Sequence, residues 1–189
     1  MGQEWQDKKD EEIVKLIQSG RVELFKLLIK RYEGKIGRYA RKFLYNRDDI
    51  NDVLQEIFIK TYINIKSFDT ARKFSPWIYR IAHNELVNAL KKNKKKLLPL
   101  LGLDIFLPYN ISREDSFNKE NDLRDIKKII NRCLDQLEPK YREPIVLYYV
   151  EGQSYKEIAD IMQIPVSTVG VRIKRGKQAM KDIYKKLNK

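Results

Sequence analysis

The chain has 189 residues, of which 39 are Lys or Arg and 26 are Asp or Glu, giving a formal net charge of +13. Such an excess favours a polyanionic partner, either nucleic acid or an acidic membrane surface. The single cysteine, Cys133, excludes an intramolecular disulfide and is typical of a reducing compartment. No apolar run approaches the roughly 20 residues that span a bilayer, and the first seven residues are polar and acidic, unlike a signal peptide. We therefore expect a soluble, cytoplasmic protein.

Helical periodicity begins near residue 11. Apolar positions in 11–32 are interrupted at Ser19 and Gly20, which predicts two helices with Gly20 as the stop of the first. A third helix is predicted through 36–44. We expect the apolar residues of all three to form core.

An amphipathic helix is predicted over 46–65, with acidic residues in its first turns, where the helix dipole favours them. Three polar residues, Asp52, Gln55 and Glu56, share its outer face. Two interpretations stay open at this point: an ordinary acidic helix start, or a surface that docks on a basic protein.

The segment 68–96 interleaves aromatic and basic residues. A loop at 68–74 contains two of each, and Ser75 is predicted as the N-cap of a helix with Pro76 as its first residue. That helix runs through 77–90 into five lysines within 91–96. Bases stack on aromatic rings and phosphates pair with cations, so this pattern suits single-stranded nucleic acid. It equally fits a core helix that ends in lysines.

Composition changes at 97–121, which we interpret as a flexible linker between two small helical domains, 1–96 and 122–189. Its first part, 97–108, is apolar but broken by two prolines and a glycine. This part either packs on a domain or becomes ordered only against a partner.

The second domain is predicted to begin with a helix from Asp122 that ends before Pro139. The next helix covers 138–151, with a kink at Pro144 and a stop at Gly152.

The last two helices form a predicted helix-turn-helix. Ser154 and Glu157 have the spacing of a capping box, which places the first helix start at Tyr155, and Pro165 marks the turn. The second helix has one apolar stripe and an outer face with Arg172 at its flank. The outer face carries Ser167, Thr168, Lys174, Arg175 and Gln178. A short helix that braces a basic one is how this motif enters a DNA major groove. The alternative is a helical hairpin with a solvated, charged face.

Catalytic and metal-binding residues are scarce. His83 is the only histidine and Cys133 the only cysteine, so a structural zinc site of four such ligands is excluded. The eight glycines are scattered and form no phosphate loop. We expect no metal, no cofactor and no enzymatic activity, and we expect His83 to be a surface or groove residue.

Three motifs, at 52–62, 74–84 and 154–177, together resemble the bacterial extracytoplasmic-function sigma factors, two-domain initiation subunits of RNA polymerase in the sigma-70 family. The resemblance extends from about Glu11 to Leu187, with a gap at the linker. It implies an all-α protein with a sigma-2-like domain at 1–96 and a sigma-4-like helix-turn-helix domain at 122–189.

The resemblance also implies a role for each motif. The first would dock on core RNA polymerase, the second would capture a flipped base while reading and opening the −10 element as single-stranded DNA, and the third would read the −35 duplex. The implied residues are Asp52, Gln55 and Glu56 for docking; Lys73, Phe74, Trp77, Arg80 and Asn84 for −10; and Ser167, Thr168, Arg172, Lys174 and Arg175 for −35. The lysines of 91–96 would contact backbone phosphate. Further implied partners include an anti-sigma factor, with no insertion into a membrane. Polymerisation would belong to the core enzyme.

One departure from the family's pattern and one alternative function concern the C-terminal module. Gly170 stands where many members of the family carry Lys or Arg, so −35 recognition should be weakened or altered. The alternative function is a stand-alone helix-turn-helix regulator that binds duplex DNA without polymerase. It would account for the C-terminal module but not for Asp52, Gln55, Glu56 or the segment 68–84. A requirement for core polymerase distinguishes the two functions.

Overall fold

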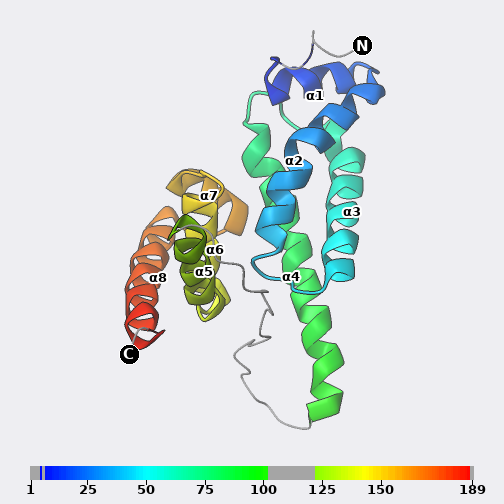
Figure 1. The fold of residues 1–189 in the computed structure, drawn as a ribbon. Coiled ribbons are helices and arrows are strands. Elements are labelled where there is room, and N and C mark those ends of the chain that lie inside the picture. The colour runs from blue at the N-terminus through cyan, green and yellow to red at the C-terminus, as the bar shows by residue number, and fades with distance from the viewer. Residues whose placement is uncertain (1–4, 6, 102–121, 188–189) are drawn as a thin grey trace.

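The computed structural model describes residue 5 and residues 7–101 and 122–187, and these described residues form helices without any strand. Figure 1 shows two groups of helices beside each other, α1–α4 and α5–α8. The predicted all-α class is confirmed. The helices are α1 (Asp10–Gln18), α2 (Phe25–Ala40), α3 (Arg47–Asn64), α4 (Phe74–Leu101), α5 (Asp122–Asp135), α6 (Pro139–Tyr149), α7 (Tyr155–Met162) and α8 (Val166–Leu187), with 3-10 turns at Val22–Leu24 and Ile65–Ser67.

In the N-terminal group, the ends of the helices are determined by local sequence. The stop after α1 lies at Ser19–Gly20 as predicted, and Gly20 has a φ of +110°, which favours glycine. Asn46 caps α3 by accepting hydrogen bonds from the backbone N–H groups of Asp48 and Asp49. The inner faces of α1–α4 then bury a common apolar core.

The predicted break between residues 32 and 36 is wrong, because α2 continues through it to Ala40. Tyr32, Ile36 and Tyr39 are all buried and keep the helical three- and four-residue spacing across this point. Gly34 is exposed and weakens a helix by only about 1 kcal/mol relative to Ala, which the packing of the buried face outweighs.

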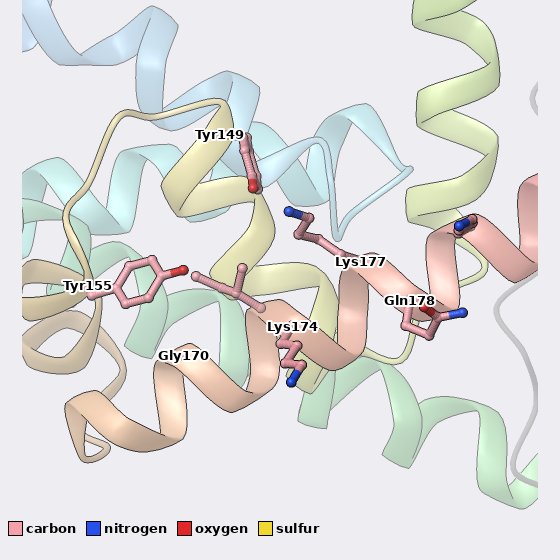
Figure 2. A pocket seen from close by; sticks show the side chains of 8 residues that line it. Tyr149, Tyr155, Gly170, Lys174, Lys177 and Gln178 are labelled. Carbon is pink, nitrogen blue, oxygen red and sulfur yellow. The ribbon is translucent and has the colours of Figure 1, made fainter.

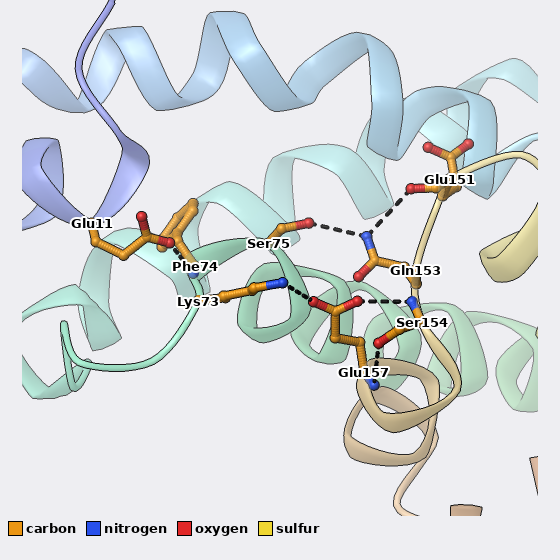
Figure 3. Close-up of polar contacts among 8 residues, drawn as sticks. All are labelled: Glu11, Lys73, Phe74, Ser75, Glu151, Gln153, Ser154 and Glu157. Atoms are coloured by element: carbon orange, nitrogen blue, oxygen red, sulfur yellow. Dashed lines mark hydrogen bonds and ion pairs between the residues drawn. The ribbon is translucent and has the colours of Figure 1, made fainter.

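The start of α4 also differs from the prediction. The helix begins at Phe74, so Ser75 is not its N-cap, and Pro76 lies within the first turn. The backbone N–H of Phe74 instead donates to the Glu11 carboxylate at 2.8 Å, as Figure 3 shows. At its other end α4 continues to Leu101, five residues into the predicted linker. The rest of that segment, 102–121, lies outside the described residues.

The C-terminal group confirms the predicted helix-turn-helix. Ser154 and Glu157 form both bonds of the capping box, and α7 begins at Tyr155. Gln163 then adopts a left-handed conformation, with a φ of 53°, which turns the chain into α8. The preceding helix, α6, ends at Tyr149, three residues before Gly152, which has a φ of +70°.

Among the described residues, no helix combines the length and the apolarity that crossing a membrane requires. Within the same ranges, no three His, Cys, Asp or Glu side chains gather where they could hold a metal ion.

Candidate nucleic-acid interface

The predicted docking residues lie on the outer face of α3. Asp52, Gln55 and Glu56 are all exposed, whereas Val53 and Ile57 on the opposite side are buried. Helix α3 packs against α4, which contains most of the predicted nucleic-acid-binding segment. The structure therefore presents an acidic and amide surface on an otherwise basic protein.

The aromatic residues at the start of α4 form a cluster rather than an open stacking platform. Phe74 is fully buried, and its ring lies 5.4 Å from that of Tyr32 and 5.5 Å from that of Trp77, measured between centroids. A base contact by Phe74 is therefore not available here, because its ring has no exposed surface. Trp77 is half-buried and packs against Phe68 at 4.9 Å. Phe74 thus supports Trp77 from behind.

Polar residues at the N-terminal part of α4 continue along one side of the helix. Trp77, Arg80 and Asn84 are separated by three and four residues, so they share a stripe. Asn84 is exposed and Arg80 is half-buried. This stripe combines a ring, a cation and an amide.

Arg80 and two cations that precede this stripe contact the C-terminal module. Arg72 Nη2 lies 2.7 Å from Asp160 Oδ2, and Lys73 Nζ lies 2.8 Å from Glu157 Oε1. Arg80 donates to the Gln163 side-chain oxygen at 3.0 Å. All three acceptors belong to α7 or to the turn that follows it. Figure 3 shows the Lys73–Glu157 contact beside the α7 capping box.

Deeper contacts between the two modules involve buried carboxylates. Glu151 accepts a hydrogen bond from the Tyr79 hydroxyl at 2.5 Å, and its side chain is only 1% exposed. Glu143 accepts from the Tyr39 hydroxyl, and His83 Nδ1 lies 2.5 Å from the same carboxylate. His83 therefore lies between the modules, with 16% of its side chain exposed.

Backbone contacts extend this interface. Arg142 is 5% exposed and donates to the Lys42 carbonyl oxygen at 2.9 Å. Gln153, 6% exposed, donates to the Ser75 hydroxyl at 3.0 Å. The predicted N-cap serine is thus used as an acceptor between modules.

These contacts alter the pKa values of the participating groups. Burial, reinforced by the hydrogen bond to Glu151, raises the pKa of Tyr79 well above its ordinary value of 10.0. Burial, followed by the charge of Glu143, raises the pKa of Tyr39 in the same direction. Burial opposes ionisation of Glu157, but hydrogen bonds from Lys73 and Ser154 outweigh it and hold the Glu157 pKa below its ordinary value. Both tyrosines therefore remain hydrogen-bond donors at neutral pH.

The predicted −35 residues follow two stripes on the side of α8 away from its buried residues. Ser167 and Lys174, seven residues apart, lie on one stripe with Gly170. Thr168, Arg172 and Arg175 follow a second stripe, on which Thr168 and Arg172 are half-buried. The buried stripe of Val169, Ile173 and Gly176 separates the two on the inner side.

A hollow of about 370 Å³ lies beside the first stripe. Tyr149 and Tyr155 approach it from the other helices, and Gly170, Lys174 and Lys177 line it from α8, as Figure 2 shows. A Cβ atom added at Gly170 would meet only the Tyr155 ring, at 3.6 Å. The glycine thus leaves open a lysine- and tyrosine-lined surface that a long side chain would cover.

Two family models match the chain at the modules described above. Sigma-70 region 2 matches residues 28–96, and sigma-70 region 4 matches residues 127–180. The ECF RNA polymerase sigma factor SigW of Bacillus subtilis is 34% identical over 173 residues, which cover 89% of this chain and 92% of that protein. The chain belongs to the ECF RNA polymerase sigma factors of the sigma-70 family.

Other relatives agree with this assignment. The ECF RNA polymerase sigma-E factor of Escherichia coli K12 is 33% identical over 177 residues, covering 90% of this chain and 92% of that protein. The sigma factor is thus a DNA-binding protein of transcription initiation, as the resemblance implied, and the alternative of a stand-alone regulator is set aside.

Two solved structures share the fold of this sigma factor. CnrH, solved in complex with the cytosolic domain of CnrY, has a TM-score of 0.68 at 23% identity, covering 92% of this chain and 96% of that chain. RpoE of Bartonella quintana, solved with the anti-sigma factor NepR, has a TM-score of 0.69 at 21% identity, covering 85% of this chain and 96% of that chain.

The carboxylates between the modules of the sigma factor were not predicted from the sequence. Glu143 lies within α6 and Glu151 follows it, and their partners Tyr39 and Tyr79 have the spacing of core positions in the sequence. A carboxylate directly before Gly152, at an otherwise apolar helix end, was the one available signal.

Proposed function

We propose that the two modules of this sigma factor perform separate tasks at a promoter. Residues 1–96 dock on core RNA polymerase and read the −10 element, residues 122–189 read the −35 element, and residues 97–121 connect them. The supporting evidence is the matched family regions together with the exposed chemistry of α3, α4 and α8.

The acidic face of α3 carries the proposal. Asp52, Gln55 and Glu56 point outward from a protein with a net charge of +13. Phosphate would be repelled by this face, so its partner is a protein with a basic surface. In a sigma factor that partner is core polymerase. Because α3 packs on α4, docking would hold the −10-reading helix against the polymerase.

The −10 element would be read by the stripe on α4. Trp77 and Asn84 would hold an unstacked base, since a ring offers stacking and an amide offers both a donor and an acceptor. A base held in this way offsets part of the few kcal/mol that unstacking costs. Lys73 and Arg80 would contact the strand, while Phe74 supports Trp77 from the core.

The −35 element would be read by α8. Ser167 and Lys174 line one edge of the helix and Thr168, Arg172 and Arg175 the other, so the two stripes would approach opposite walls of a major groove. Gly170 contributes no side chain to this surface, so the exposed Tyr155 ring behind it is accessible at that position.

We further infer an inhibitory protein partner. A structural relative was solved with an anti-sigma factor, and the extensive contact between modules offers a conformation that such a protein could hold. The chain itself would be neither an enzyme nor a cofactor protein, because nucleotide chemistry belongs to the core polymerase. It would act in the cytoplasm, where that polymerase transcribes.

Retention of purified core RNA polymerase tests the proposal. Wild-type protein should retain core polymerase stoichiometrically, and Gln55→Ala/Glu56→Ala should lose it, because both exposed side chains leave the docking face. Glu33→Ala, which removes an exposed carboxylate from α2, should retain core normally. Retention of core by the double variant as strong as that of wild type would refute docking through α3.

A further inference from the structure

The loop at 68–73 leads into the helix that the proposed function assigns to −10 DNA. Its first residue, Phe68, is buried, and the Phe68 ring lies 4.9 Å from that of Trp77. Its last residue is Lys73, and most residues between these two ends are exposed. The conformation of this loop therefore determines how Trp77 is supported and where Lys73 is presented to the strand.

Gln18, the last residue of α1, contacts the backbone at the beginning of the loop. Its side-chain amide nitrogen donates to the carbonyl oxygens of Ile65 and Phe68, each at 2.8 Å. Both hydrogens of this amide are thus used by backbone acceptors, which lie 47 and 50 residues further along the chain. Gln18 therefore fixes the path of the backbone itself as it enters the loop.

Glu11, in the first turn of the same helix, contacts the backbone at the end of the loop. Its carboxylate accepts at 2.8 Å from the N–H of Phe74, the first residue of α4, as Figure 3 shows. A carboxylate at this place satisfies a donor that has no partner within the helix, and it interacts favourably with the helix dipole. Glu11 therefore fixes the point at which the loop ends and α4 begins.

The two side chains lie on one face of α1. Glu11 and Gln18 are seven residues apart, which is two helical turns and about 10 Å along the axis. Both are half-buried, and α1 packs beside the Ile65–Ser67 turn and α4. A single rigid helix therefore holds both ends of the loop at a fixed separation.

Hydrogen bonds within the loop restrict its shape between these two ends. Asp69 Oδ1 accepts from the backbone N–H of Ala71 at 2.9 Å, and the Asp69 carbonyl oxygen accepts from the N–H of Arg72 at 3.0 Å. Such a turn is local, so it sets the curvature of the loop but not its direction relative to α4. That direction depends on the contacts with α1.

We propose that Glu11 and Gln18 are positioning residues for −10 recognition. Helix α1 fixes both ends of the loop at 68–73, and it thereby sets the geometry in which the α4 stripe selects a base. The inference rests on the proposed function of α4. It extends −10 recognition to a helix that precedes the residues matched by sigma-70 region 2, 28–96.

Selection from single-stranded DNA of random sequence, with the full chain bound to core polymerase, tests the role of Gln18. Gln18→Met keeps the length of the side chain but cannot donate to the two carbonyl groups. Among the retained strands, enrichment of the preferred base at the most selective position should fall roughly three- to tenfold. The total amount of retained DNA should change by less than about twofold, because phosphate contacts supply most of the affinity.

Gln18→Glu gives a graded comparison. Its carboxylate oxygens would face the same two carbonyl oxygens and repel them, so enrichment should fall further than in Gln18→Met. Unchanged enrichment in both variants would overturn the proposal. A fall in total retention as large as the fall in enrichment would also overturn it, because general destabilisation of the domain lowers both.

Glu11 allows a rescue by the conservative variant. Glu11→Leu should lower enrichment, whereas Glu11→Gln should keep most of it, because the glutamine side-chain oxygen can still accept from Phe74. The matched control, Glu12→Leu, makes the same change in charge at the adjacent, exposed residue of α1 and should leave enrichment unchanged. Equal losses in Glu11→Leu and Glu12→Leu, or no rescue by glutamine, would refute positioning by Glu11.

Asn84→Ala distinguishes failure of the inference from failure of the proposed function. This substitution removes the amide that the proposed function assigns to the base itself, so enrichment should fall in the same selection. Unchanged enrichment in Asn84→Ala would refute the −10 assignment and the positioning role that depends on it. Lower enrichment in Asn84→Ala, without any loss in Gln18→Met, would refute the positioning role alone.

Discussion

At the scale of single residues, two glycines of α8 illustrate how position determines the role of the same residue. A Cβ atom at Gly176 would lie 2.6 Å from Ile145 Cδ1 and 3.3 Å from the Tyr141 carbonyl oxygen. At Gly170 it would meet only Tyr155, at an ordinary contact distance of 3.6 Å. Gly176 is thus required for the close approach of α6 and α8, whereas Gly170 is not required by packing.

Alanine substitutions at these two glycines should have opposite effects. Gly176→Ala should lower the free energy of unfolding by about 1–3 kcal/mol, because the added methyl group overpacks the α6–α8 contact. Gly170→Ala should raise it by up to about 1 kcal/mol through helix propensity. Urea unfolding of the two variants compares them in one helix of one protein. A loss of equal size in both would contradict this account of the packing.

Asn84 should affect promoter opening rather than polymerase binding. Its exposed amide lies on the α4 stripe with Trp77, whereas the proposed docking residues lie on the outer face of α3. Asn84→Ala should therefore reduce open-complex formation while leaving retention by core polymerase unchanged. Permanganate reactivity of unpaired thymines measures the first quantity and co-purification measures the second. Parallel losses in both would remove the role assigned to Asn84.

At the scale of elements, α7 depends on its cap. The helix has only eight residues, which is too short to be stable in isolation. The backbone N–H of Glu157 donates to the Ser154 hydroxyl, and the Glu157 carboxylate accepts from the Ser154 backbone N–H at 2.8 Å. The same glutamate pairs with Lys73, so the cap and the contact between modules share one carboxylate.

Removing the cap should therefore cost stability. Ser154→Ala should lower the free energy of unfolding by about 1 kcal/mol, because one backbone donor of α7 loses its acceptor. Ser154→Thr, which keeps a hydroxyl group at the same position, should restore most of the loss. Thermal unfolding of the three proteins measures both effects. An alanine variant as stable as the threonine variant would show that the cap contributes nothing.

Helices with strong local signals could be predicted from the sequence, whereas contacts between modules could not. The capping box and the Gly20 stop are encoded within a few residues, so the boundaries of α1 and α7 followed directly. The start of α4 was misplaced by two residues, because the backbone N–H of Phe74 is satisfied by Glu11, on a different helix. The hydrogen bond between Tyr39 and Glu143 joins residues 104 positions apart and leaves no periodic pattern.

The residues of the candidate site divide in the same way: local spacing predicted the position of some, and only the packing of the folded protein determines that of others. The outward direction of Asp52, Gln55 and Glu56 followed from helical spacing, because their apolar neighbours define the buried side. Phe74 could not be assigned in this way, since an aromatic residue beside cations is equally suited to stacking on a base or to packing in a core. Its burial against Tyr32 decides for the core.

At the scale of the whole molecule, the contact between modules is mainly polar. Tyrosine hydroxyl groups of the N-terminal module meet carboxylates of the C-terminal one, at Tyr39–Glu143 and Tyr79–Glu151. Hydrogen bonds to a charged acceptor are worth about 1.5–3 kcal/mol each, and they depend on protonation as apolar contacts do not. The stability of this contact between the modules should therefore respond to pH.

Alkaline pH should lower the free energy of unfolding of the protein. The Tyr79 pKa is raised by folding, so its contribution is complete below pH 10.0, the ordinary value, and decreases as pH rises above it. The decrease approaches about 1.4 kcal/mol per pH unit for one such group. Tyr79→Phe should give a shallower fall of the unfolding free energy above pH 10.0 than wild type.

A tyrosine outside the interface provides the control for that measurement. Tyr62→Phe changes a side chain that is 47% exposed, and it should leave the steep alkaline fall of the wild type intact. Identical slopes for all three proteins would mean that Tyr79 does not gain its stability from the buried contact with Glu151.

The insertion of Glu151 beside Tyr79 also limits how such a gene can change over generations. A recombination event that joined this N-terminal half to the C-terminal half of a distant relative would bring together donors and acceptors that had no common history. The recombinant would leave the Tyr79 hydroxyl, or the incoming side chain opposite it, buried without a counterpart. Halves that each bind DNA well could then fail as one protein, so Tyr79 and Glu151 should be inherited as a pair.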